Sequence, residues 1–225
     1  MATVTSRTPP GPESVTDRQW FIVGRWQEVE GETRANLLRI IAIGLYYSIE
    51  LAAQYGLLLG WLQLAPAVDP RAHQVITLVA VAWTMVALAV HVMLREQIFP
   101  VGLKYATTAS DIVLLTTMLL VAHGPRSAMV VGYFLIIALA GLRFQLRLVW
   151  CATLGSMAGY LFLLGYAKWF ASETVRADMT VPRYQQLIFL AALAMLGVIL
   201  GQIVRRVKVI AAHYAAQLDR MKANL

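Results

Sequence analysis

The sequence predicts an all-α integral membrane protein, a bundle of six transmembrane helices with a cytoplasmic C-terminal helix. Of its 225 residues, 59% are hydrophobic and only 14% are charged, a composition more apolar and less charged than that of a typical soluble domain. The apolar residues also fall in six blocks, and crossing about 30 Å of hydrocarbon takes about 20 helical residues. The six predicted spans are Leu37–Leu62, Val75–Leu94, Tyr105–Ala122, Ala128–Leu142, Leu148–Phe170 and Leu187–Ile203.

Two segments precede the six-helix transmembrane domain, which we place at residues 35–203. Residues 1–15 are rich in Thr, Pro and Ser and are expected to form a disordered cytoplasmic tail. In residues 16–34, apolar side chains including Trp20 and Trp26 alternate with charge, which favours an amphipathic helix lying in the membrane interface. A short hairpin over Phe21–Val29 is the alternative for this segment.

Breaks between the spans coincide with proline, glycine and charge, which end helices. They fall at Pro66 and Pro70, at Pro100, at Gly124–Pro125 and over Glu173–Pro182. The loops expected on the outer side are all short. We therefore expect one membrane domain with two cytoplasmic flanks and no external ligand-binding domain.

The distribution of basic residues predicts the orientation, because cytoplasmic flanks carry an excess of Lys and Arg. Fourteen of the nineteen Lys and Arg residues fall in the N-terminal flank, the second-to-third turn, the fourth-to-fifth turn and the C-terminal tail. We therefore expect a multi-pass protein of the cell inner membrane with both termini cytoplasmic. Its basic edge should attract anionic lipid of the inner leaflet. The basic residues are spread along the membrane edges, so no nucleic acid is expected as a partner.

The sixth span continues into a helical pattern over residues 204–225. Apolar or small side chains recur at alternating steps of three and four, the a/d spacing of a coiled coil. They are Val204, Val207, Ala211, Tyr214, Leu218, Met221 and Leu225. This spacing favours a cytoplasmic coiled coil between two copies of the chain. The alternative is a basic helix lying on the membrane surface, since Arg205, Arg206 and Lys208 begin the segment.

Three G-x-x-x-G patterns occur in the spans, at Gly56/Gly60, Gly155/Gly159 and Gly197/Gly201. Each lets a neighbouring helix approach closely. Gly197 and Gly201 run into the seam of the tail, so the sixth helix is a candidate dimer axis inside the bilayer as well as outside it. The alternative is that these glycines pack within a single bundle.

Ionisable residues inside apolar spans are costly, so each is a functional hypothesis. Counting 1.5 Å per residue from Arg39 places Glu50 roughly 16 Å deep, near the midplane. Counting from Arg95 and Lys104 places His91 and Asp111 at similar depths, where they are predicted to hydrogen-bond. The expected polar cluster, for ligand or proton sensing, comprises Glu50, His91, Asp111, Tyr46, Tyr47 and Gln54. The alternative is interhelical hydrogen bonding that only fixes the packing.

Several chemistries lack a sequence basis. Only His91 among the four histidines lies inside a span, which disfavours a pair of facing haem ligands. The sequence shows no metal-ligand spacing, no phosphate-binding loop and no nucleophile motif. Cys151 is the one cysteine, so a disulfide within this chain is excluded. We therefore expect no enzyme activity, no cofactor and no metal.

With this layout in view, the chain from about Arg34 to Leu225 resembles the six-helix membrane anchor and sensor modules of bacterial cyclases and histidine kinases. The resemblance lies in the cytoplasmic termini, the short outer loops and the last helix, which runs from Gly197 through Arg205 and Arg206 into the seam. In those modules an effector domain follows the helix. The resemblance therefore implies a cytoplasmic effector domain or protein as a partner.

Three functions are consistent with these features. The first is a sensor or anchor domain that dimerises and relays its state through the last helix. The second is a small transporter or channel subunit with a polar path at Glu50, His91 and Asp111. The third is an accessory subunit of a larger membrane complex.

Overall fold

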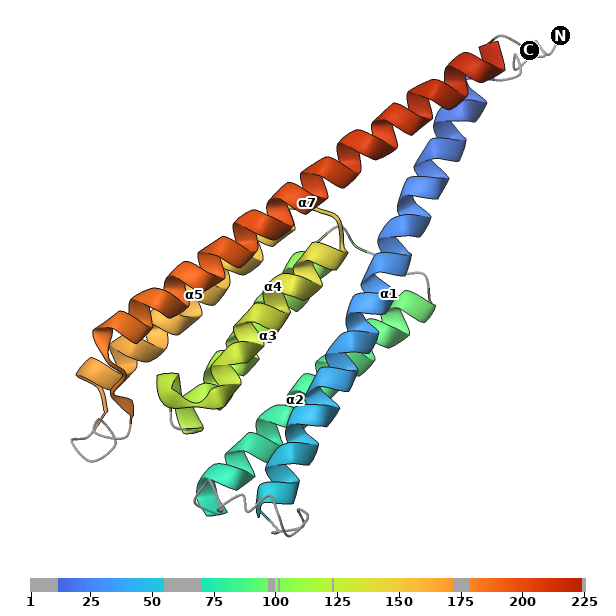
Figure 1. Cartoon of the computed structure of the whole chain (residues 1–225). Coiled ribbons are helices and arrows are strands. Elements are labelled where there is room, and N and C mark those ends of the chain that lie inside the picture. Colours follow the sequence, from blue (N-terminus) through green and yellow to red (C-terminus); the bar gives the residue numbers. More distant parts are fainter. Residues whose placement is uncertain are drawn as a thin grey trace, which may run out of the picture.

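The computed structural model describes residues 12–54, 70–96, 100, 102–122, 124–171 and 179–223. Within these residues the chain forms six α-helices and two short 3-10 helices, and no strand (Figure 1). The α-helices are α1 (Pro12–Gln54), α2 (Pro70–Arg95), α3 (Leu103–Val121), α4 (Gly132–Leu142), α5 (Leu146–Trp169) and α7 (Arg183–Ala223). The 3-10 helices η1 (Gly124–Arg126) and η2 (Ala128–Val131) lead from α3 into α4.

The first helix differs from the sequence-based expectation. It is continuous from Pro12 to Gln54, so it joins the segment 16–34 to the first span and includes residues 12–15 of the expected disordered tail. The hairpin alternative over Phe21–Val29 is therefore wrong. A glycine inside a helix costs only about 1 kcal/mol, and helix propagation is cooperative, so Gly24 and Gly31 do not interrupt α1. Residues 1–11 and 55–62 lie outside the described part of the chain.

Four of the described helices contain segments long and apolar enough to cross a membrane, judged by length and composition. These segments are Glu30–Ala52, His73–Arg95, Leu146–Trp169 and Arg183–Tyr214. Ala128–Leu142 forms a shorter apolar stretch, and α3, which carries Lys104 and Asp111, is not among the four. Large side chains such as Leu78 point outward from the bundle. A helical membrane protein has this apolar exterior because lipid surrounds it.

Helix α5 lies at the centre of the packing and contacts α3, α4 and α7. Helix α1 packs on α2, and α2 packs on α3. Aromatic contacts join α7 to its neighbours, because the centroid of the Phe189 ring lies 5.2 Å from that of Phe134, edge-on, and 4.4 Å from that of Tyr160. The bundle core is built from fully buried apolar side chains of α3, α4, α5 and α7. They include Leu119, Tyr133, Ile137, Leu148, Leu163 and Leu193.

Glycines let the helices of this one chain approach closely. A Cβ atom added at Gly197 would lie 2.3 Å from the Thr153 Oγ1 of α5. One added at Gly155 would lie 2.6 Å from the Ile112 Cδ1 of α3, and one at Gly159 would lie 2.9 Å from Thr116 Oγ1. At Gly197 the space is filled by α5 of the same chain, as in the alternative of packing within one bundle, and a dimer axis through this helix stays a prediction. The pair Gly56/Gly60 lies outside the described residues.

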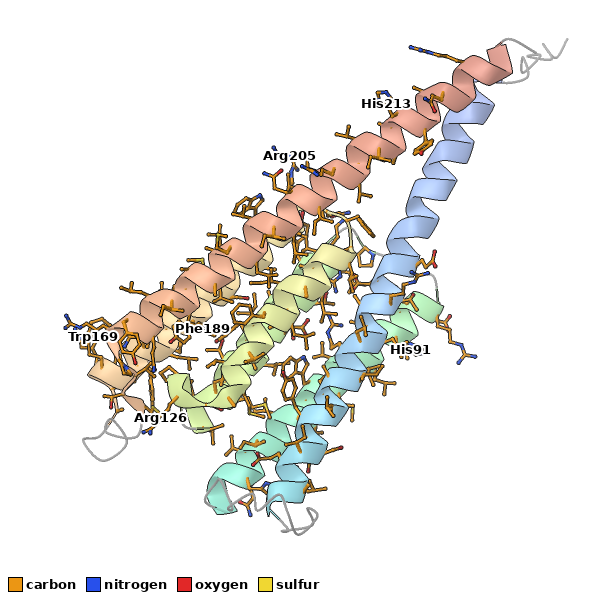
Figure 2. The ribbon with its side chains drawn as sticks, viewed as in Figure 1. His91, Arg126, Trp169, Phe189, Arg205 and His213 are labelled. Atoms are coloured by element: carbon orange, nitrogen blue, oxygen red, sulfur yellow. The ribbon has the colours of Figure 1, made fainter. Side chains whose placement is uncertain are left out.

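The last helix supports the expected continuity from span to tail. It is a single helix of 41 residues, and its buried side ends at Gly201 and Val204. Beyond that point the seam side chains that the structure describes, Val207, Ala211 and Tyr214, are exposed, Val207 by 41% and Tyr214 by 65%. Figure 2 places Arg205 and His213 on this projecting part, and Arg126 and Trp169 at the opposite end of the bundle.

Candidate functional site

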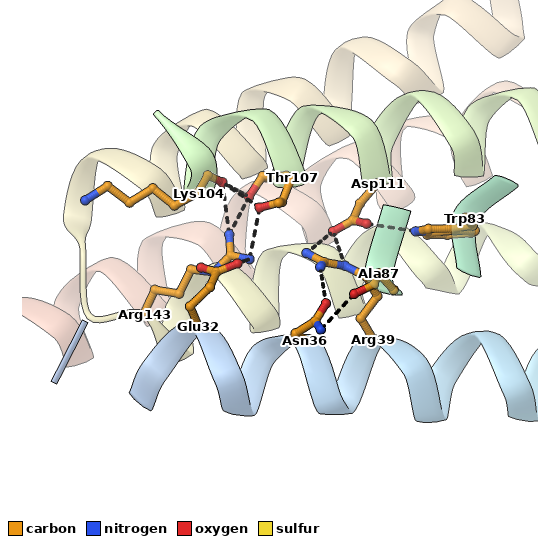
Figure 3. Close-up of polar contacts among 10 residues, drawn as sticks. Glu32, Asn36, Arg39, Trp83, Ala87, Lys104, Thr107, Asp111 and Arg143 are labelled. Atoms are coloured by element: carbon orange, nitrogen blue, oxygen red, sulfur yellow. Dashed lines mark hydrogen bonds and ion pairs between the residues drawn. The ribbon is translucent and has the colours of Figure 1, made fainter. Parts of the chain in front are cut away.

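A polar stripe on α1 begins the buried site. Glu32, Asn36 and Arg39 are spaced four and three residues apart, which places them on one face of the helix. All three are at most 2% exposed although the helix around them is apolar. Buried groups of this kind need hydrogen-bonding partners, and each has one on another helix or on its own helix (Figure 3).

Arg39 and Asp111 form the first ion pair, between α1 and α3. The Nε of Arg39 donates to Asp111 Oδ2 at 3.0 Å, and Nη2 lies 2.9 Å from the same oxygen. The Arg39 Nη1 donates to Asn36 Oδ1 at 2.8 Å. From α2, the Trp83 indole donates to Asp111 Oδ1 at 2.8 Å, and Ala87 O accepts from Asn36 at 3.0 Å. The pair therefore joins α1, α2 and α3.

Arg143 and Glu32 form the second ion pair, where α4 ends. The Arg143 Nη2 lies 2.7 Å from Glu32 Oε1 and also donates to Thr107 Oγ1 at 3.2 Å. Its Nη1 donates to the Lys104 carbonyl oxygen at 3.0 Å and to Thr108 Oγ1 at 2.8 Å. One guanidinium thus joins α1, the start of α3 and the end of α4.

The turn after Arg143 has an unusual backbone conformation. Phe144 has a φ of 50°, the left-handed conformation that ends many helices but that favours glycine. Its backbone N–H donates to the Gly141 carbonyl oxygen at 3.1 Å, which closes the last turn of α4. A non-glycine residue held in this conformation costs about 1 to 3 kcal/mol and persists where its surroundings enforce it.

The charges of the site balance. Two guanidinium groups face two carboxylates, and the side chains of Arg39 and Asp111 are 2% and 4% exposed. In this buried environment the effective dielectric constant is low. The two charges of each pair therefore attract one another strongly, and either charge without its partner would cost free energy. Burial lowers the pKa of the Arg143 guanidinium from its ordinary value, while the nearby Glu32 carboxylate opposes that shift. The site is therefore a neutral polar network inside an apolar bundle.

The predicted cluster of Glu50, His91 and Asp111 is not assembled. Asp111 is buried but bonds to Arg39 and Trp83, whereas the predicted partner His91 is exposed. Glu50 Oε1 lies 4.0 Å from His73 Nδ1, at the opposite end of α2 from His91. The predicted hydrogen bond between His91 and Asp111 is therefore wrong. Arg39, expected at the membrane edge, is buried beside Asp111, and Glu50 lies near the far end of the apolar segment Glu30–Ala52.

Tyr46 and Tyr47, two other predicted residues, line a pocket next to the Arg39–Asp111 pair. This interhelix pocket is narrow, with about 30 Å³ of space for water-sized molecules. Its walls come from α1, α2, α3, η2 and α4. The Tyr47 hydroxyl also lies 3.4 Å from Thr77 Oγ1 of α2. The side chain of Gln54 lies outside the described part of the chain.

Sequence reasoning missed four of the residues that form this site: Glu32, Asn36, Trp83 and Arg143. Glu32 falls in the expected interfacial segment 16–34, and Arg143 falls in the expected cytoplasmic turn between the fourth and fifth spans. The spacing of Glu32, Asn36 and Arg39 was the available signal, since polar groups on one face of an apolar helix indicate a buried partner surface. Lys104, Thr107 or Thr108, and Asp111 repeat this spacing on α3.

Among the described residues, no group of three or more His, Cys, Asp or Glu side chains is placed to hold a metal ion. Comparison with family models, with curated proteins and with solved structures finds no match for the chain.

Proposed function

We propose that this chain is a membrane-embedded sensor or anchor domain that dimerises and relays the state of its bundle through α7 to a cytoplasmic effector. In this proposal all six predicted spans cross the inner membrane and both termini are cytoplasmic. The observation that carries the proposal is the two-part character of α7. One helix of 41 residues is packed against α4 and α5 at one end and exposes apolar seam residues at the other.

A rigid helix with these two ends is suited to signal relay. A shift of one packed helix against its neighbours is an established switching mode. Because α7 is unbroken, a shift at Gly197 and Leu193 moves Val207 and Tyr214 with it. The exposed Arg205, Arg206 and Lys208 follow the packed region directly and would lie at the anionic inner leaflet. The bilayer edge thereby separates the sensing part from the relaying part.

The buried polar network supplies the bundle with defined contacts. Arg143 ties the end of α4 to α1 and α3, and α4 in turn contacts α7. Each buried charge must pair with one particular partner or another. When an ion pair exchanges its partner, the helices that carry the charges therefore move from one defined position to another. The network is therefore the element through which a change near α1 reaches α7.

Among the described residues, no contact supports the transporter alternative. Glu50, His91 and Asp111 each have different surroundings, so they do not line one polar path. The accessory-subunit alternative has no observation of its own either, because an apolar exterior is common to membrane proteins.

The test is the oligomeric state of the detergent-purified chain, measured by mass. We expect a dimer for the full chain and a monomer for a chain ending at Val209. A single substitution gives a sharper contrast: Val207→Lys places a charge on the seam, and Val209→Lys places the same charge off it. Both valines are exposed, by 41% and 60%, so neither change disturbs the bundle core.

We expect Val207→Lys to weaken the dimer at least tenfold, since a lysine at an a/d position is costly, and Val209→Lys to leave the dimer intact. A monomeric full chain would overturn dimerisation through α7. Equal effects of the two lysines would also overturn it, because the contact would then not follow the seam.

A further inference from the structure

The projecting part of α7 exposes an apolar face that is wider than the coiled-coil seam. Val207, Ala211 and Tyr214 lie on the seam. Ile210 occupies the g position that flanks the seam, and it is exposed by 55%. At 3.6 residues per turn these four side chains span about 100° of the helix surface. A two-stranded coiled coil uses the narrower a/d stripe, whereas a helix of a larger bundle is apolar at a, d and either e or g. A second α7 alone would therefore leave part of this face uncovered.

The N-terminal part of α1 leaves the bundle at the same level as this face. A Cβ atom added at Gly31 would lie 3.6 Å from the Leu142 carbonyl oxygen, and one added at Gly141 would lie 3.3 Å from Leu200 Cδ1. Helices α1 and α7 therefore pass the end of α4 at the same height. Beyond it each continues for about 30 Å, at 1.5 Å per residue, toward the same side of the molecule and in opposite chain directions (Figure 1). Two copies side by side would bring four segments of similar length together.

The net charges of these segments are complementary. Residues 12–30 of α1 contain four acidic and two basic residues, whereas residues 204–223 of α7 contain one acidic and five basic residues. Two α7 segments packed only on one another would bring two strongly basic helices together, which is unfavourable. The α1 segment has the opposite net charge and also supplies large apolar residues, among them Trp20 and Trp26. It therefore suits the uncovered part of the α7 face in charge and in polarity.

The α1 segment of the same chain is set apart from this face where the two helices leave the bundle. Within the described residues, the main contacts of α1 are with α2 and α4, and those of α7 are with α4 and α5. Helix α4 thus lies between α1 and α7 (Figure 1). Packed helices are about 8 to 10 Å apart, so two helices on either side of a third are roughly twice as far apart. The α1 of a second copy is free of this constraint.

We propose that the projecting part of the dimer is a four-helix bundle, in which the exposed apolar face of α7 packs against residues 12–30 of α1 from the second copy. The α7 of the second copy covers the seam, and its α1 covers the flank at Ile210. The inference rests on the proposed function, because it needs the dimer through α7. In such a bundle a shift of one α7 is passed to the second copy through α1 as well as through α7.

Cross-linking between two differently tagged full chains tests which helix lies next to Ile210. Both chains carry Cys151→Ser, one carries Ile210→Cys, and the other carries a single cysteine at one of four consecutive α1 positions. These positions are Gln19, Trp20, Phe21 and Ile22. They surround one turn of α1 and lie about as far from Gly31 as Ile210 lies from Gly201. We expect a short bis-maleimide to join the two tags from at least one of the four positions.

Val209→Cys is the matched control for Ile210→Cys. Val209 is 60% exposed, but it points away from the seam. We expect at least fivefold less cross-linked product from Val209→Cys than from Ile210→Cys with the best of the four α1 positions. Equal yields from the two α7 positions would overturn the proposal, because the α1 segment would then not follow the apolar face.

Ile210→Lys gives an independent result from the stability of the dimer. A two-stranded coiled coil tolerates a lysine at a g position, where charged residues are usual. In the four-helix bundle Ile210 is covered, so we expect Ile210→Lys to weaken the dimer at least tenfold, as Val207→Lys does. Ile210 is exposed in the single chain, so this change leaves the bundle core intact. An Ile210→Lys chain that dimerises as well as Val209→Lys would overturn the four-helix arrangement.

The outcomes separate this inference from the proposed function. Val207→Cys in both chains should link α7 to α7 in any dimer that forms through the seam. If that link forms but no α1 position is joined to Ile210→Cys, the dimer stands and the four-helix bundle is overturned. If the full chain is a monomer and no link forms, both proposals are overturned.

Discussion

The bundle buries two oppositely charged pairs, Arg39 with Asp111 and Arg143 with Glu32. An ion pair removed from water recovers its desolvation cost only when both partners are present and well hydrogen-bonded. Arg39 and Asp111 meet this condition through Asn36 and Trp83. Such a pair adds little net stability over an apolar pair of the same size, but it makes each partner indispensable to the other.

We therefore predict that Asp111→Asn lowers the free energy of unfolding by about 3 to 5 kcal/mol, because it leaves the Arg39 charge buried without a counter-charge. The double variant Arg39→Met with Asp111→Leu should recover most of that loss, since it removes both charges together. Reversible unfolding in mixed detergent micelles containing increasing dodecyl sulfate measures the difference.

Glu50→Gln is the matched control for Asp111→Asn, because it also replaces a carboxylate of this bundle by the corresponding amide. Its one described ion-pair contact is His73 at 4.0 Å, so we expect a loss of at most about 1 kcal/mol. A double variant that is less stable than Asp111→Asn alone would show that the two charges do not act as a pair.

At this scale the sequence identified which residue types were unusual but not how they pair. Asp111 and Arg39 are recognisable because charges are rare in apolar helices. Their pairing depends on the relative height of α1 and α3, which local sequence does not encode. Counting the helix rise from Arg39 as an edge residue places Glu50 near the midplane, and the separate counts from Arg95 and Lys104 match Asp111 to the exposed His91. The four-and-three spacing from Glu32 to Arg39 indicates instead that Arg39 faces a partner helix.

At the scale of the elements, the contact between α5 and α7 depends on Gly197. Any side chain there would overlap Thr153, since an added Cβ would lie 2.3 Å from its Oγ1 and 2.6 Å from its Cγ2. We predict that Gly197→Ala destabilises the bundle by about 1 to 3 kcal/mol, the usual cost of overpacking a core. The same dodecyl sulfate unfolding measurement tests this.

Two further variants separate packing from backbone effects. A Cβ added at Gly44 meets no atom within 4 Å, so Gly44→Ala should stabilise α1 by about 0.5 to 1 kcal/mol through helix propensity alone. Thr153→Ala removes the two closest atoms and should restore much of the stability lost in Gly197→Ala. If Gly197→Ala were neutral, α7 would have room to move away from α5 without penalty.

The helices themselves were largely predictable, because long apolar blocks bounded by proline and glycine have few alternatives. The expected block Ala128–Leu142 corresponds to η2 and α4, and Leu148–Phe170 corresponds to α5. Their assembly was not predictable in the same way. A G-x-x-x-G pattern indicates that a helix surface permits close approach. Whether α5 or a second copy occupies the surface at Gly197 depends on tertiary packing.

At the scale of the whole molecule, the two longest helices, α1 and α7, extend beyond the others at the same end of the bundle (Figure 1). The basic residues Arg205, Arg206 and Lys208 lie at this end, whereas Arg126 lies at the other (Figure 2). Two of the basic residues counted toward the inner side, Arg39 and Arg143, are buried in ion pairs. The remaining asymmetry still favours placing the long helix ends in the cytoplasm.

This orientation and the number of spans can be tested together in spheroplasts with a membrane-impermeant maleimide. In a Cys151→Ser background, single cysteines replace Ala128 between α3 and α4, Phe170 after α5, or His213 on the projecting part of α7. All three positions are exposed.

If all six helices cross, Ala128→Cys and Phe170→Cys are labelled from outside, and His213→Cys only after permeabilisation. If only the four longer segments cross, Ala128→Cys becomes protected while Phe170→Cys stays accessible. Labelling of His213→Cys in intact spheroplasts would reverse the orientation and remove the basis for a cytoplasmic relay.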